Sequence, residues 1–223
     1  MRHYILAFII SCFFGTVFGQ DELVINYESI QELISNKEGE SYYPNLLKRF
    51  NEFDSTLTLK DYSLIYYGFS FQDDYLNNQP TETNLKEFLK TNDYEKIVSE
   101  CLNILDKNPV SLLATNKMGY ALFKLKKPEK EWKKYQNRYR AIRKVIVYSG
   151  NGLSAESAFK VIYVSDEYDI LYDYFEISKI HNQSLVGMCG RFEVEPSEYY
   201  KLKEIYFDIS RKLIRQQEII DNK

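Results

Sequence analysis

Residues 149–164, SGNGLSAESAFKVIYV, decide the fold, because the spacing of apolar residues changes within this stretch. Before it, apolar residues recur every three or four positions, as on one face of a helix. From Phe159 onward they follow strand alternation, and the residues between them are also largely apolar, which is typical of a covered strand. We therefore predict an α+β chain, in which antiparallel helices precede a small antiparallel β-sheet.

Helical spacing of apolar residues predicts a series of helices upstream of this stretch. They begin near Tyr27, at Pro44, after Thr58, after Asp93, at Leu112 and near Glu129. Thr58 and Asp61 resemble a capping box, and Pro44 suits the first turn of a helix. The polar segment 76–84 contains Pro80 and is predicted to be a loop.

The positions of Pro109 and Gly119 suggest tetratricopeptide-like packing, in which two antiparallel helices meet at a small residue. Pro109 would close one unit of about 34 residues, and Gly119 would let the first helix of the next unit approach its neighbour. Gly68 resembles the same feature one unit earlier. The helical part is therefore predicted to be tetratricopeptide-like over about one and a half units.

Further strands are predicted after Phe159. Asp166 and Glu167 are expected to turn a hairpin into a strand over 168–175, and two more strands are expected over 191–195 and 204–209. The predicted organisation is a signal peptide (1–19), a helical region (20–148), a sheet packed on the helices (149–210) and a tail (211–223) that is a short charged helix or a frayed end.

The N-terminal residues have the pattern of a secretory signal peptide. Arg2 supplies the positive charge, an apolar run extends to Phe18, and Val17 and Gly19 suit a cleavage site before Gln20. The apolar run is too short to span a bilayer, so no transmembrane helix is expected after cleavage. We expect a periplasmic or extracellular protein. In the alternative, Cys12 belongs to a loose lipobox and carries a lipid anchor.

Composition excludes several classes of function. The formal net charge is −3, without a basic block that would indicate nucleic-acid binding. After cleavage, His181, Cys101 and Cys189 are the only histidine and cysteines left, too few for a Cys/His zinc site. No metal and no cofactor are predicted. An exported protein could form a Cys101–Cys189 disulfide, but the place of Cys101 in an apolar helical stripe favours a buried thiol.

Asp73 and Asp74 form the best candidate binding site. Their carboxylates could bind a cation or a polyol hydroxyl, and the aromatic rings nearby could stack on a sugar. The candidate residues of this stretch are Tyr66, Tyr67, Gln72, Asp73, Asp74 and Tyr75. In the structural alternative, the two acids only end a helix, and adjacent helical side chains would point about 100° apart.

Two other stretches are weaker candidates. Glu167 and Tyr168 could form a site with His181, but His181 has no evident nucleophile partner and is expected in a polar loop. The glycines of SGNG, followed by Glu156, could suggest a calcium or phosphate loop. The stretch lacks the Asp ladder of an EF-hand and the Lys-Ser/Thr of a P-loop, and a turn that requires glycine explains it equally well.

Four stretches carry a resemblance to a known family: YYPNLLKRF (42–50), LTLKDYSLIYYGFSFQDDY (57–75), SGNG…SAFKVIYVSDEY (149–168) and KEIYFDIS (203–210). Over about residues 25–210 the chain resembles secreted proteins of Bacteroidota catalogued as domain of unknown function 4919. The resemblance implies a bacterial envelope setting and a tetratricopeptide-like helical part. It implies no activity.

These observations favour a non-enzymatic binding or scaffolding protein of the bacterial cell envelope, with a protein or peptide partner. In the alternative, the protein is an envelope enzyme that acts on glycans or small polar ligands through Asp73, Asp74 or Glu167. The two hypotheses differ in geometry. Carboxylates that converge in one pocket favour the enzyme, whereas dispersed carboxylates favour binding.

Overall fold

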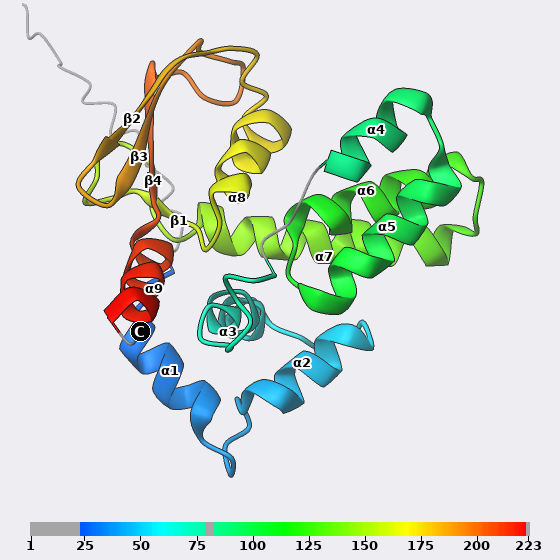
Figure 1. Cartoon of the computed structure of the whole chain (residues 1–223), viewed down its shortest axis with the longest axis horizontal. Coiled ribbons are helices and arrows are strands. Elements are labelled where there is room, and N and C mark those ends of the chain that lie inside the picture. The colour runs from blue at the N-terminus through cyan, green and yellow to red at the C-terminus, as the bar shows by residue number, and fades with distance from the viewer. Residues whose placement is uncertain (1–22, 79–82, 222–223) are drawn as a thin grey trace, which may run out of the picture.

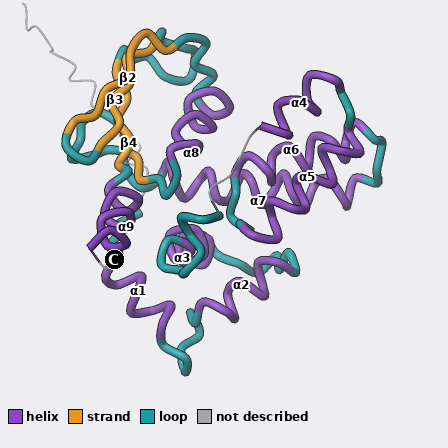
Figure 2. Tube along the Cα trace, in the orientation of Figure 1, coloured by secondary structure: helices purple, strands orange, loops and turns teal. Residues whose placement is uncertain are grey.

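The computed structural model describes residues 23–78 and 83–221. The predicted signal peptide, its cleavage site, Cys12 and Pro80 lie outside these residues. Helices form most of the described chain, and a four-stranded sheet lies toward its C-terminus, which confirms the α+β class (Figure 1). Figure 2 shows the strands gathered in one part of the molecule, apart from most of the helices.

The upstream helices form where the sequence predicts them. They are α1 (Tyr27–Ser35), α2 (Tyr43–Asn51), α3 (Leu59–Phe69), α5 (Tyr94–Lys107), α6 (Leu112–Lys124) and α7 (Glu129–Val147). Local caps explain several starts. Thr58 and Asp61 form the predicted capping box of α3, and the Asp93 and Ser111 side chains accept backbone N–H bonds at the starts of α5 and α6.

One helix, α4 (Thr83–Thr91), is not predicted, and the loop expected over 76–84 extends into its start. The start of this helix is polar and follows Pro80, and these two features led to the prediction of a loop. Its apolar residues nevertheless have helical spacing, and Leu85 is buried against α5 and α6. Packing on neighbouring helices therefore decides the structure of this segment.

The sheet comprises β1 (Phe159–Lys160), β2 (Ile180–Val186), β3 (Cys189–Val194) and β4 (Glu204–Asp208), in the order β1-β4-β3-β2. The strands predicted over 191–195 and 204–209 are confirmed as β3 and β4. The sheet is mixed rather than purely antiparallel, because β1 runs parallel to β4 with Phe159 opposite Phe207. The long connection between β1 and β4 makes this parallel pairing possible.

The strand predicted from Phe159 forms only at its start, as β1, and the hairpin and the strand predicted over 168–175 are wrong. β1 ends at Lys160, and the chain becomes helical in α8 (Val164–Asp169) and in the π-helical turn η1 (Ile170–Tyr174). Residues 161–163 are buried but leave the sheet, so their apolar character could not distinguish a strand from a covered irregular segment. His181 lies in β2 rather than in a loop.

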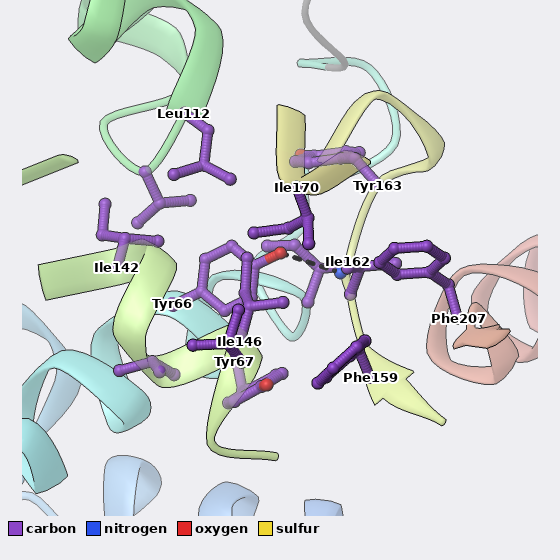
Figure 3. Packing of buried hydrophobic residues seen from close by; sticks show 14 of the residues in the cluster. Tyr66, Tyr67, Leu112, Ile142, Ile146, Phe159, Ile162, Tyr163, Ile170 and Phe207 are labelled. Atoms are coloured by element: carbon purple, nitrogen blue, oxygen red, sulfur yellow. Dashed lines mark hydrogen bonds between the residues drawn. The ribbon is translucent and has the colours of Figure 1, made fainter. Parts of the chain in front are cut away.

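Two hydrophobic clusters hold the structure together, and α7 belongs to both. Trp132 and Tyr135 pack on the smaller cluster, which joins α4, α5 and α6, whereas Ile142 and Ile146 lie in the larger one. The larger cluster combines α1, α2 and α3 with the sheet, and Figure 3 shows residues of α3, α7 and the sheet packed together in it. The larger core therefore includes side chains of both the upstream helices and the sheet.

The tail forms a helix, α9 (Ser210–Asp221), which is anchored at its start. The Arg211 side chain donates to the Oγ and the carbonyl of Ser70 and lies 4.0 Å from the centre of the Phe71 ring. The first turn of α9 is therefore fixed against the end of α3.

Candidate functional site

Three of the candidate tyrosines are structural. Tyr66, Tyr67 and Tyr75 are fully buried, and their hydroxyl groups hydrogen-bond to the segment that leads from β1 into α8. Tyr66 donates to Asp166 Oδ2 at 2.6 Å, Tyr67 donates to the Lys160 carbonyl at 3.0 Å, and Tyr75 donates to the Ile162 carbonyl. Figure 3 shows Tyr66 and Ile162, whose N–H donates to the Tyr66 hydroxyl. The tyrosine hydroxyl groups thus join the stretch 57–75 to the stretch 149–168.

Asp166 and Glu167 form a buried acidic pair in the first turn of α8. Burial raises the pKa of Asp166 to about 7, and the hydrogen bond from Tyr66 opposes this rise. Burial and the Asp166 charge raise the pKa of Glu167 to about 8. Glu167 is therefore mostly protonated at neutral pH, whereas Asp166 is about half protonated.

Glu167 has an unusual environment. Its side chain is 1% exposed, and neither carboxyl oxygen has a hydrogen-bond partner among the described residues. One oxygen lies under β3, where a Cβ atom added to Gly190 would approach it to 2.6 Å. A side chain at position 190 would therefore require the Glu167 carboxyl to move. Glu167 lines neither of the two clefts described below.

Tyr168 lies at a different surface from the other candidates. It lines a cleft of about 620 Å³ beside α8, which we call the α8 cleft. The lining of this cleft includes Lys86, Lys117, Tyr168, Asp169, Tyr172 and Asp173. The rings of Tyr168 and Tyr172 stack with their centres 6.1 Å apart, and the Tyr168 hydroxyl donates to Gln183 of β2. His181 lines a different recess from Tyr168, and its Nε2 hydrogen-bonds to Glu195.

Gln72, Asp73 and Asp74 line a second cleft, also of about 620 Å³, between α2, the end of α3, α5 and α7. We call it the α5 cleft. Its lining includes Leu47, Gln72, Asp73, Asp74, Leu102 and Arg138. Asp73 and Asp74 are exposed, and Leu102 is an exposed apolar side chain. Of the predicted site residues, the structure therefore brings these three polar residues together at one recess.

Arg138 is the residue of the α5 cleft that sequence reasoning missed. Its side chain is only 5% exposed, and its guanidinium carbon lies 4.0 Å and 3.6 Å from the ring centres of Phe50 and Phe53. It donates one hydrogen bond, to the Phe50 carbonyl. A signal for it exists in the sequence, because Arg138 falls in register with the apolar stripe of α7 that includes Tyr135 and Ile142.

The SGNG stretch has a structural role. The Ser149 hydroxyl accepts the Lys160 N–H at 2.8 Å, and the N–H groups of Asn151 and Gly152 both donate to the Ser157 carbonyl. A Cβ atom at Gly150 would lie 2.5 Å from two backbone oxygens, and Gly152 has a φ of +70°. Both glycines are therefore needed to connect α7 to β1.

The described residues bear on the possibilities of a metal site and of a Cys101–Cys189 disulfide. They contain no group of three or more His, Cys, Asp or Glu side chains arranged to hold a metal ion. Cys101 and Cys189 are both buried as free thiols. None of the described helices has the length and apolarity needed to cross a bilayer.

Comparison with known protein families identifies the family of the chain. It belongs to the family described as Domain of unknown function (DUF4919), whose model matches residues 28–218. The match covers both the helical part and the sheet. Neither the curated proteins nor the solved structures include a match to the chain.

Proposed function

We propose that this protein is an exported, non-enzymatic binding protein of the bacterial cell envelope, and that the α5 cleft takes a peptide segment of a partner protein. One observation carries the proposal. The candidate carboxylates do not converge, because Asp73 and Asp74 line the α5 cleft while Glu167 is buried beneath β3. Dispersed carboxylates favour binding over acid–base catalysis, which needs groups within reach of one substrate bond.

The chemistry of the α5 cleft suits a peptide with basic and apolar side chains. Leu47, Leu102 and Leu105 supply apolar contact area, and Leu102 is 53% exposed. Asp73, Asp74 and Asp106 give this surface three carboxylates, against the cations of Lys107 and Arg138. The complementary occupant therefore buries aliphatic side chains against the leucines and presents Lys or Arg to the acids.

The architecture around the cleft supports this use. α5, α6 and α7 are consecutive helices that pack side by side, and consecutive helical hairpins build extended surfaces suited to peptides. α7 is fixed in both hydrophobic clusters, so the wall that carries Arg138 is rigid. A rigid wall reduces the ordering cost of binding.

Selection of displayed random peptides against the immobilised mature chain tests the proposal. The affinity of each selected peptide is then measured by fluorescence polarisation. Leu102→Asp should weaken binding by about tenfold or more, because it replaces apolar contact with a charge. Leu153→Asp is the matched control, since Leu153 is also 53% exposed but does not line the cleft. Selected peptides should be enriched in Lys, Arg and Leu.

Two results would overturn the proposal. The first is a failure to select any peptide, and the second is equal binding of selected peptides by the Leu102→Asp and Leu153→Asp variants. Turnover of a glycan that is abolished by Asp73→Asn, Asp74→Asn or Glu167→Gln would instead establish an envelope enzyme.

A further inference from the structure

The Arg138 guanidinium carries a buried positive charge that is not ion-paired to any carboxylate of the described residues. Within the described part of the chain, no carboxylate forms an ion pair with it, and the nearby ionisable groups that act on it are the phenols of Tyr135 and Tyr62. Burial lowers the pKa of Arg138 to about 10, which still leaves it charged at neutral pH. A buried cation without a counter-ion is costly, and the Phe50 and Phe53 rings offset that cost only in part.

The geometry leaves the guanidinium able to bind an anion. Stacking on Phe50 and Phe53 uses its flat surface, whereas its N–H bonds lie in its plane. Nη2 donates to the Phe50 carbonyl, which holds the group in place. Since Arg138 also lines the α5 cleft, an occupant of the cleft can reach it.

We propose that Arg138 is a carboxylate-binding subsite of the α5 cleft, which recognises a carboxylate group of the bound peptide. This inference rests on the function proposed above. It names the chemical group of the peptide that would set the position of the peptide along the cleft. A planar carboxylate matches the guanidinium with two parallel hydrogen bonds. Asp73, Asp74 and Asp106 line the same cleft and repel a doubly charged phosphate more strongly than a singly charged carboxylate.

The carboxylate can come from the C-terminus of the partner chain or from an Asp or Glu side chain. Three synthetic libraries of N-acetylated peptides, built from Lys, Leu, Phe and Ser, separate these sources. The first has a free C-terminal carboxylate, the second has a C-terminal amide, and the third has the amide and one internal Glu. Binding to the mature chain is measured by affinity selection and mass spectrometry.

We expect at least one carboxylate-bearing library to bind about tenfold or more tightly than the amide library. Arg138→Met should remove this preference. Arg211→Met is the matched control, because Arg211 is also buried and stacks on a phenylalanine, at 4.0 Å, but lies outside the cleft. If Arg138→Met does not fold, Arg138→Lys, which keeps the charge but loses the planar pair of donors, should reduce the preference severalfold.

The outcomes separate the two proposals. Equal binding of all three libraries by the wild-type chain would overturn the carboxylate subsite and leave the peptide-binding function standing. A preference that survives Arg138→Met would also overturn the subsite. Failure of all three libraries to bind would overturn both.

Discussion

The Tyr66 hydroxyl donates a hydrogen bond of 2.6 Å to Asp166 Oδ2, joining α3 to α8 across 100 positions in the sequence. The same hydroxyl accepts the Ile162 N–H at 3.2 Å. One phenol thus serves two polar groups in the interior, where unpaired donors and acceptors are costly. This contact explains why Tyr66 lies inside the protein rather than at a binding surface.

Tyr66→Phe should destabilise the protein by about 1–3 kcal/mol, because the buried Asp166 carboxyl loses one of its donors and the Ile162 N–H loses its acceptor. Urea denaturation followed by circular dichroism measures the change. Tyr172→Phe is the control, since Tyr172 is 47% exposed and should change little. Equal stability of the two variants would show that the Tyr66 hydroxyl contributes nothing to the fold.

The buried acids predict a specific dependence of stability on pH. Burial raises the pKa values of Asp166 and Glu167 to about 7 and about 8, so both are protonated in the folded state at mildly acidic pH. Unfolding exposes them, and they then release protons at the ordinary carboxyl pKa of about 4. The free energy of unfolding should therefore fall as pH rises from about 4 toward 8, by up to about 1.4 kcal/mol per pH unit for each group.

Glu167→Gln should flatten this decline, because it removes one of the two titrating groups. The measurement is the free energy of unfolding in urea at a series of pH values from about 5 to 8. Glu198→Gln, at an exposed carboxylate, is the control and should keep the wild-type slope. An unchanged slope in the Glu167→Gln variant would contradict the raised pKa of Glu167.

Gly119 and Gly68 should respond differently to added side chains. A Cβ atom at Gly119 would come no closer than 3.4 Å to α7, so Gly119→Ala should be tolerated and gain up to about 1 kcal/mol of helix propensity. Gly119→Leu should push α6 and α7 apart and cost about 1–3 kcal/mol. At Gly68 a Cβ atom would lie 3.0 Å from the Tyr43 ring, so even Gly68→Ala should lower the melting temperature. A melting temperature unchanged by Gly119→Leu would argue against close packing of the two helices.

Export predicts a defined mature terminus. N-terminal sequencing of the protein isolated from its native cells should begin at Gln20, unmodified or cyclised to pyroglutamate. Mass spectrometry tests the alternative, in which Cys12 is the lipidated first residue. A protein that still begins at Met1 would contradict export.

The upstream helices were predictable from the sequence because their causes are local. The Thr58–Asp61 capping box, the Asp93 cap and the apolar stripes lie within each helix or beside it, so the sequence carries the whole signal. The strands β3 and β4 were predictable for the same reason. Gln72, Asp73 and Asp74 could be recognised as a polar cluster, and they line one cleft.

Tertiary structure decided the rest, because the deciding contacts join residues far apart in the chain. The chain leaves the sheet after Val161, and the Tyr66 hydroxyl binds the Ile162 N–H and the Asp166 carboxyl, so α8 forms where strand alternation indicated a hairpin. The parallel pairing of β1 with β4 depends on the same long connection. Arg138 belongs to the α5 cleft only because α2 brings Phe50 and its neighbours against α7. Apolar spacing shows which residues avoid water, whereas their partners depend on how the helices and strands pack.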